Sequence, residues 1–414
     1  MQRVYRQVCS KRAISEDQFS RGLIDFDFSI GGQTVWIPNR SYFRVGLKIV
    51  NKANPATQVQ MSDNVTFANY CPGNLFDNCF FMAGGQNVSS ITNYSGQAHA
   101  AAYRLKKSGA WLNTIGKDAY GINSSYEYRL NQTAQDGQWM NGSGSFDAAN
   151  VPQPDERAMD SVYMMYAPPL GIMEHGKPMA SGDYRFQFNP ASNFESAGLE
   201  SEIATATYKL VVTSMELYIC TEKQEVAASG TEVLHLMEHQ IQSKPLGGAG
   251  DKNFDFTVPS STKAISIFVQ SGNAGSTTLT PPSKFCCGDA DQERTLKSIQ
   301  VTYANITKPP TRWTSEYTQA EHKLQQRYLD TQIESSQAFS PGGAQSLKQW
   351  MDDGVLLHYS WIRDANDRST QLQLQIDYGI AEANANIFLI SHYTKSIEIQ
   401  VNNGFVSSVS SLII

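Results

Sequence analysis

Hydrophobic and polar residues alternate along much of the chain, a pattern typical of half-buried antiparallel strands. Segment 182–188 places its three aromatic residues on one face of a strand, and segments 371–376 and 396–401 follow the same rule with aliphatic residues. Fully apolar runs predict further strands that are covered on both faces. These runs lie at 42–50, 208–220, 265–269 and 387–390.

Helical signals are few. Residues 95–112 are rich in alanine, and residues 314–333 place apolar side chains near one stripe, so both segments favour helices. A third, shorter helix is predicted at 231–242. Long stretches rich in glycine, asparagine, serine and proline lie between the elements and indicate surface loops. The pattern is therefore a β-rich chain with one strong helix in each half.

The two halves carry the same landmarks in the same order. Pro38 and Pro259, each just before a strand, are 221 residues apart, and the same offset carries Phe80 onto Val301, each in a strand that precedes a helix. Each half then closes with a pair of strands, at 208–212 with 215–219 and at 387–390 with 397–401. This common order indicates a duplicated β-domain.

About eight short strands, long loops and one helix in each half suit a jelly roll, in which two four-stranded sheets pack face to face. We therefore predict an all-β protein of two tandem eight-stranded antiparallel jelly rolls, with one helix inserted in a long loop of each. The predicted parts are an N-terminal arm (1–30), the first roll (31–222), a linker (223–230), the second roll (231–405) and a C-terminal tail (406–414).

The second half carries the most specific likeness to a known family. A strand at 299–303 is followed by Lys308-Pro309-Pro310, by the helix from Thr314, and by strands near 355–361 and 372–376. Over residues 30–405 this order resembles the double jelly-roll major capsid proteins of tailless icosahedral double-stranded DNA viruses, the lineage of adenovirus-like, polinton-like and virophage-like elements. The likeness is one of order and pattern.

The resemblance implies a structural subunit of a viral capsid and no enzyme activity. Such proteins form homotrimers in which six rolls make a pseudo-hexagonal block that tiles the shell. The implied partners are the chain itself, neighbouring capsomers, and penton and minor capsid proteins, without a cofactor or a small-molecule substrate. The implied location is the virion. Arg3, Arg6, Lys11 and Arg12 are candidates for a basic arm that faces an inner membrane or the genome, and a solvated, frayed terminus is the alternative.

Composition narrows the function classes. The 414 residues include 33 basic and 39 acidic side chains, and this net charge of -6 argues against a general nucleic-acid binder. Aromatic residues make up 11% of the chain and charged residues only 17%, which excludes intrinsic disorder. The first residues are not followed by the apolar stretch of a signal peptide, so we expect no secretion signal.

One short motif points to different chemistry. His235-Leu236-Met237-Glu238-His239 has the spelling of an inverted zinc-protease motif, whose two histidines bind zinc from one face of a helix. Pro245 and Gly247-Gly248 follow too closely for a long helix, and the candidate third ligands Asp251 and Asp255 fall in loop and strand sequence. We therefore interpret the motif as a chance match.

Other reactive residues have structural interpretations. His358 and His392 lie in strand sequence, where we expect hydrogen-bonded core or interface groups. Cys286 and Cys287 are adjacent, and two separate thiols are favoured over a vicinal disulfide in a reducing compartment.

A binding module is the alternative function. Jelly rolls also occur in lectins, and exposed tyrosine, tryptophan and asparagine side chains could hold a sugar or a receptor. A receptor-binding spike or penton protein belongs to the same alternative. The doubled roll and the expected lack of a secretion signal favour the capsid interpretation.

Overall fold

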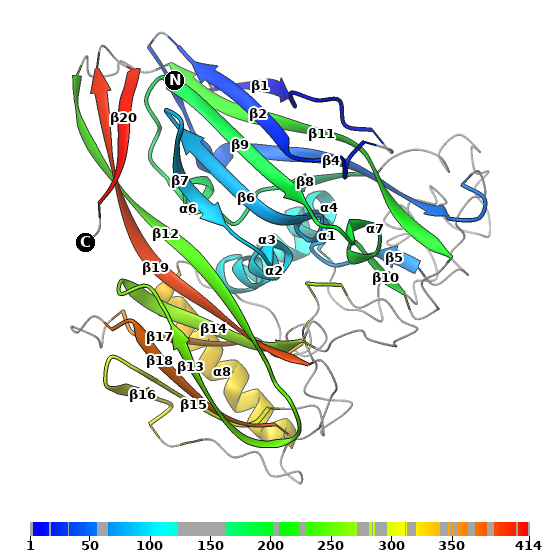
Figure 1. The fold of residues 1–414 in the computed structure, drawn as a ribbon, viewed down its shortest axis with the longest axis vertical. Helices are drawn as coiled ribbons and strands as arrows, with labels where there is room; N and C mark the ends of the chain where they lie inside the picture. Colours follow the sequence, from blue (N-terminus) through cyan, green and yellow to red (C-terminus); the bar gives the residue numbers. More distant parts are fainter. Residues whose placement is uncertain are drawn as a thin grey trace.

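The computed structural model shows two β-rich rolls joined side by side (Figure 1). It describes residues 3–15, 18–31, 33–55, 65–122, 162–201, 207–223, 229–270, 281–283, 285, 296–310, 312, 320–339, 347, 350, 354–362, 369–378, 385–402 and 405–412.

The first roll consists of two antiparallel sheets. One has the order β1 (Arg3–Cys9), β11 (Tyr208–Lys223), β4 (Tyr42–Asn51) and β8 (Val162–Tyr166), and the short β3 (Thr34–Trp36) also pairs with β11. The other has the order β2 (Ile24–Ile30), β9 (Gly182–Pro190), β6 (Phe76–Ala83) and β7 (Gln86–Ile91). A separate pair joins β5 (Val65–Phe67) to β10 (Leu199–Ser201).

The second roll has the same construction. One sheet has the order β12 (Ser229–Pro245), β19 (Asn386–Asn402), β14 (Thr262–Gln270) and β17 (Leu357–Ser360), and β20 (Phe405–Leu412) also pairs with β19. The other has the order β13 (Gly250–Thr257), β18 (Gln371–Tyr378), β15 (Leu296–Tyr303) and β16 (Ile306–Lys308).

The two rolls share one topology. If the eight main strands of each roll are numbered along the chain, both rolls give sheets of order 1-8-3-6 and 2-7-4-5. This is the jelly-roll arrangement of two packed antiparallel sheets. The prediction of two tandem eight-stranded jelly rolls is confirmed.

The longer helices occupy equivalent places in the two rolls. Helix α2 (Ser95–Lys106) lies between β7 and β8, and α8 (Ala320–Ala338) lies between β16 and β17, so each follows the fifth main strand of its roll. No helix in the described ranges is long and apolar enough to cross a membrane. The other helical elements of the described residues are short: the 3-10 turn η1 (Pro38–Arg40), α1 (Cys71–Asn74), α3 (Gly109–Trp111), the π turn η3 (Leu112–Gly116), α4 (Lys117–Tyr120), α6 (Gly171–Glu174) and α7 (Phe194–Ala197).

Alternating sequence explains why the sheets pack face to face. In β9 the rings of Phe186 and Phe188 point inward and are fully buried, while the intervening polar residues face outward. Phe43 of β4, in the opposite sheet, meets both rings edge-on, with ring centroids 5.3 and 4.9 Å apart. Each such aromatic pair is worth about 0.5–1.5 kcal/mol beyond the area that it buries. A core that combines aliphatic residues, such as the fully buried Ile267 and Leu374, with aromatic ones, such as Trp350 and Trp361, fills the second roll.

Equivalent hairpins also use equivalent turns. Gly84 and Gly85 join β6 to β7 with φ angles of 55° and 78°, and Ala304 and Asn305 join β15 to β16 with φ angles of 50° and 63°. Two successive residues with positive φ are the signature of the type I′ turn, whose twist matches that of the flanking strands. The repeat therefore extends to local backbone geometry.

Several predicted elements differ from the structure. The third helix, at 231–242, is wrong, because these residues belong to β12. The two closing strand pairs are instead the single long strands β11 and β19. The register shifts where β11 pairs with β4 and where β19 pairs with β14 and β20. The helix predicted at 314–333 is described from Ala320 and continues to Ala338, while 313–319 lie outside the described residues.

The predicted ends of the chain also need correction. Residues 3–9 and 24–30, assigned to an N-terminal arm, are strands β1 and β2 of the first roll. Residues 405–412, assigned mainly to a tail, form β20. Strand β1 is almost wholly exposed and pairs with residues 216–222, so its sequence gave no burial pattern to detect. Strand β2 does alternate, with Ile24, Phe26, Phe28 and Ile30 buried, and this signal was overlooked. Most of the predicted linker, 224–228, lies outside the described residues.

Candidate functional site

Buried and half-buried polar side chains form several hydrogen bonds at the contact between the two rolls. We call it the seam: helix α2, with Tyr94 just before it, lies against the outer side of the sheet β12–β19–β14–β17 (Figure 1). The Tyr94 hydroxyl lies 2.8 Å from Ser243 Oγ, and its ring meets Phe388 edge-on at 5.1 Å. The Gln97 amide donates to Gln270 Oε1 at 3.1 Å. Side chains of β12, β14 and β19 thus all face the first roll.

A buried arginine also crosses the seam. Arg104 of α2, only 2% exposed, donates to the carbonyl oxygen of Gly354 at 2.5 Å and to that of Trp350 at 3.3 Å. Its guanidinium also lies 5.2 Å from the ring centroid of Phe285. A charge is buried here only because carbonyls and a ring face replace its water. The first roll therefore holds the chain segment that leads into β17 of the second.

A row of hydrogen bonds runs through the seam, which we call the histidine chain. Lys106 Nζ of α2 lies 3.0 Å from His239 Nε2, and His239 Nδ1 lies 2.9 Å from His392 Nδ1. His392 Nε2 lies 2.7 Å from Ser266 Oγ, which lies 2.9 Å from His358 Nδ1. The expectation that His358 and His392 are hydrogen-bonded internal groups is confirmed.

The lysine fixes the direction of the bonds from His239 as far as Ser266, whose hydroxyl keeps a proton to donate. An ammonium group can only donate, so His239 Nε2 accepts and His239 Nδ1 carries the proton. His239 then donates to His392 Nδ1, His392 donates to Ser266, and the Ser266 hydroxyl donates to His358 Nδ1. All three imidazoles are neutral in this arrangement, and each uses its only lone pair.

Burial and charge keep the histidines neutral. Burial, followed by the positive charges of Lys106 and Lys308, lowers the pKa of His358 to about 3. Burial, then Lys106, holds the pKa of His239 well below its usual value. The pKa of His392 falls far below its usual value for the same reason, with His239 and His358 adding to the effect. Glu174 pairs with Lys106 at 2.6 Å on the first-roll side.

The structure excludes the helical zinc motif at 235–239. In a strand, residues four apart lie about 13 Å from each other, too far to share one metal ion. His235 is exposed and bonds Ser396 Oγ at 2.8 Å, whereas His239 belongs to the histidine chain. The candidate third ligands Asp251 and Asp255 lie on β13, in the other sheet of the second roll. No cluster of three or more metal-binding side chains occurs within the described ranges.

Glu238 is a buried acid beside the seam. It is 1% exposed, and burial raises its pKa to about 7, against the opposing effects of Ser89 and Lys395. Its position on β12 faces β7 of the first roll, and Gly171 of α6 leaves it room. The seam therefore holds groups whose protonation near neutral pH is tied to folding.

The four candidate arm residues all bond within the first roll. Arg3 pairs with Glu222 at 3.1 Å and Lys11 with Asp27 at 2.5 Å. Arg12 donates to the carbonyl oxygens of Phe19 and Gly22, each at 2.7 Å, and Arg6 donates to that of Ser29 at 2.9 Å. These side chains fix β1 and the following loop in place, which contradicts a detached arm. That they face a membrane or a genome stays a prediction.

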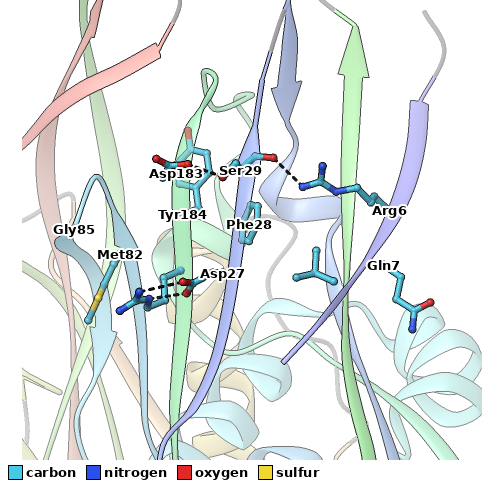
Figure 2. Close-up of a pocket in the computed structure, with 11 residues that line it drawn as sticks. Arg6, Gln7, Asp27, Phe28, Ser29, Met82, Gly85, Asp183 and Tyr184 are labelled. Carbon is cyan, nitrogen blue, oxygen red and sulfur yellow. Dashed lines mark hydrogen bonds and ion pairs between the residues drawn. The ribbon is translucent and has the colours of Figure 1, made fainter. Parts of the chain in front are cut away.

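A cleft of about 650 Å³ opens beside Arg6, between the edge strands β1 and β2 (Figure 2). Its charged groups are already paired: Arg185 binds Asp27 at 2.6 Å, and Ser29 Oγ donates to Asp183 at 2.6 Å. Such internal pairing leaves little for a charged ligand to bind. Cys286 and Cys287 lie outside the described residues.

The outer side of the sheet β1–β11–β4–β8 carries a cluster that the sequence analysis missed. We call it the tyrosine face: Tyr5, Tyr42, Tyr163, Tyr218 and Arg44. Tyr42 and Tyr218 stack at 5.3 Å, and Arg44 lies 5.0 and 5.2 Å from the ring centroids of Tyr163 and Tyr218. Tyr5 is 51% exposed and Tyr163 54%. The alternation of Tyr42 and Arg44 with buried Phe43 was the available signal.

Comparison with solved structures decides the fold. The chain superimposes over 100% of its length on 88% of a chain in the cryo-EM structure of the Sputnik virophage, with a TM-score of 0.63 and 11% identity. It covers 90% of the mavirus major capsid protein (TM-score 0.51, 9% identity, 99% of this chain). It also covers 90% of the faustovirus major capsid protein (TM-score 0.52, 10% identity, 97% of this chain).

The fold is the double jelly roll. No family model matches the chain, and no curated protein matches it in sequence. The double jelly roll is thus recognised through its strand order and three-dimensional structure, at sequence identities of about a tenth.

Proposed function

We propose that this chain is the major capsid protein of an icosahedral virus and works by assembly rather than by bond chemistry. One observation carries the proposal: the paired rolls match the mavirus and faustovirus major capsid proteins over nearly the whole of this chain and 90% of theirs. A likeness confined to one roll would have fitted many binding modules equally well.

The assembly that we propose is a trimer whose six rolls form a pseudo-hexagonal block. Each chain has two rolls of identical topology that a buried seam holds together. Each chain would therefore supply two of the six rolls, one third of the block. Neighbouring trimers, penton and minor capsid proteins, and an inner membrane or the genome are the proposed further partners. The proposed location is the virion.

Solution mass tests the proposal. We expect the purified protein to elute with three times the chain mass of 45.8 kDa, and negative-stain images of that peak to show a hexagonal outline. A stable single chain with two separate lobes would contradict the proposal. It would favour a jelly-roll binding module instead.

A further inference from the structure

The seam inside the chain joins two different surfaces of equivalent rolls. The first roll contributes the side that carries its helix α2, and the second contributes the outer side of its sheet β12–β19–β14–β17. Because the rolls repeat, each chain also has one more surface of each kind. These are the helix side of the second roll, with α8, and the outer side of β1–β11–β4–β8 in the first roll.

The two helices differ in the way that this repeat predicts. Helix α2 lies within the seam, and every residue from Ser95 to Leu105 is buried. Helix α8 buries Arg327, Thr331 and Ser335 but leaves Leu329 50% and Ile333 58% exposed. Leu329 and Ile333 are four residues apart and therefore lie on one face of the helix. Helix α8 thus has an exposed apolar face, whereas the equivalent helix α2 is covered by the other roll.

The two sheets differ in the corresponding way. The outer side of β12–β19–β14–β17 is covered by the first roll and carries the histidine chain together with Phe268 and Phe388. The equivalent outer side of β1–β11–β4–β8 carries the tyrosine face, with half or more of Tyr5 and Tyr163 exposed. Tyrosine and arginine are the residue types enriched where protein surfaces bind each other.

One chain cannot bring its own two open surfaces together. Helix α8 belongs to the second roll, at the bottom of Figure 1, whereas β1, β11, β4 and β8 lie at the top, in the first roll. We propose that the tyrosine face of one copy receives the Leu329–Ile333 face of α8 from a second copy, repeating between chains the seam that exists within the chain. This inference rests on the proposed trimer and names the surfaces that form it.

The contact is heterologous, since it joins two different patches. A heterologous contact closes into a ring when its rotation divides a full turn, and otherwise grows without end. If the contact between chains repeats the one within the chain, seams inside and between chains alternate around a single ring. Arg44 pairs with Glu216 of its own sheet at 2.5 Å, so the proposed contact rests on the tyrosine rings of one surface and the apolar side chains of the other.

Two variants test the two surfaces separately. Ile333→Asp places a charge on the apolar face of α8, and Tyr163→Asp places one on the tyrosine face. Both positions are exposed in the chain itself, so we expect both variants to fold. Each should elute as a single chain, at one third of the wild-type mass. Phe405→Asp is the matched control, since this aromatic residue is 49% exposed on β20, and it should keep the trimer.

Mixing the two variants provides the decisive observation. Ile333→Asp retains an intact tyrosine face and Tyr163→Asp retains an intact α8, so an equimolar mixture should form a species of two chains that neither variant forms alone. Variants that remain trimeric would overturn the surfaces proposed here while leaving the trimer standing. Single-chain variants whose mixture stays single-chain would also overturn them. A wild-type protein that is itself a single chain would instead refute the proposed function.

Discussion

The histidine chain makes the stability of the second roll depend on acid. His358 is 1% exposed, accepts a hydrogen bond from Ser266 through Nδ1 and faces Phe339. Among the described residues, Lys106 and Lys308 are the charged groups that act on it, and Glu174 and Glu334 pair with those lysines. Protonating His358 would place a third positive charge in this buried site.

The size of the effect follows from the difference in pKa between the folded and unfolded states. The pKa of His358 is about 3 in the folded protein, because of burial and then the two lysines, whereas an unfolded histidine titrates near 6.5. Between these values the unfolded chain binds the extra proton. The stability is therefore fully present above about pH 6.5 and is lost as the pH falls toward 3. At about pH 5 the loss from this one residue is about 2 kcal/mol.

Replacing His358 with asparagine isolates this contribution. The asparagine Oδ1 can accept the Ser266 hydrogen bond but does not titrate. We expect the fall in unfolding free energy between about pH 7.5 and about pH 5, measured by urea unfolding with tryptophan fluorescence, to be about 2 kcal/mol smaller in His358→Asn than in the wild type. His235→Asn, at an exposed position on β12, is the matched control. An equal fall in wild type and His358→Asn would refute this account of the seam.

Two further substitutions probe the seam from other directions. Burial raises the pKa of Glu238 to about 7, so the stability that the protonated carboxyl contributes is lost as the pH rises through that value. Glutamine stays neutral at every pH. Glu238→Gln should therefore stabilise the protein by about 3 kcal/mol at about pH 8 and have little effect at about pH 4. A urea-unfolding gain that is equal at both pH values would contradict this. Gly354→Ala should destabilise by at least about 2 kcal/mol, because Gly354 has φ +87° and a Cβ there would collide with the Phe285 backbone. Gly248→Ala, with open space around it, is the control, and equal thermal unfolding midpoints for the two variants would show the reasoning to be wrong.

The sequence predicted most reliably those strands whose burial alternates. Segment 182–188 became β9 and segment 371–376 lies within β18, because one buried face and one polar face leave a strand no other register. The order of landmarks also predicted the repeat, which the sheet topology confirms. Segment 231–242 was misread as a helix because Glu238 and His239 are adjacent and both buried, so the strand lacks strict alternation.

The functional surfaces were harder to predict, for a physical reason. His239, His358 and His392 come from three strands and meet only through sheet pairing and the packing of α2. Nothing in the sequence around any one of these histidines predicts that it contacts the other two. The tyrosine face has the same origin, since Tyr42 and Tyr218 become neighbours only when β4 pairs with β11. A pattern along the chain shows which side of a strand is buried, not which other surface covers it.

A cryo-EM reconstruction of the main solution species tests the central claim most directly. We predict a closed ring of six jelly rolls from three chains, with the α8 of each chain seated on the β1–β11–β4–β8 sheet of the next. A single chain, or a trimer in which the two rolls of a chain are not neighbours in one ring, would contradict the account.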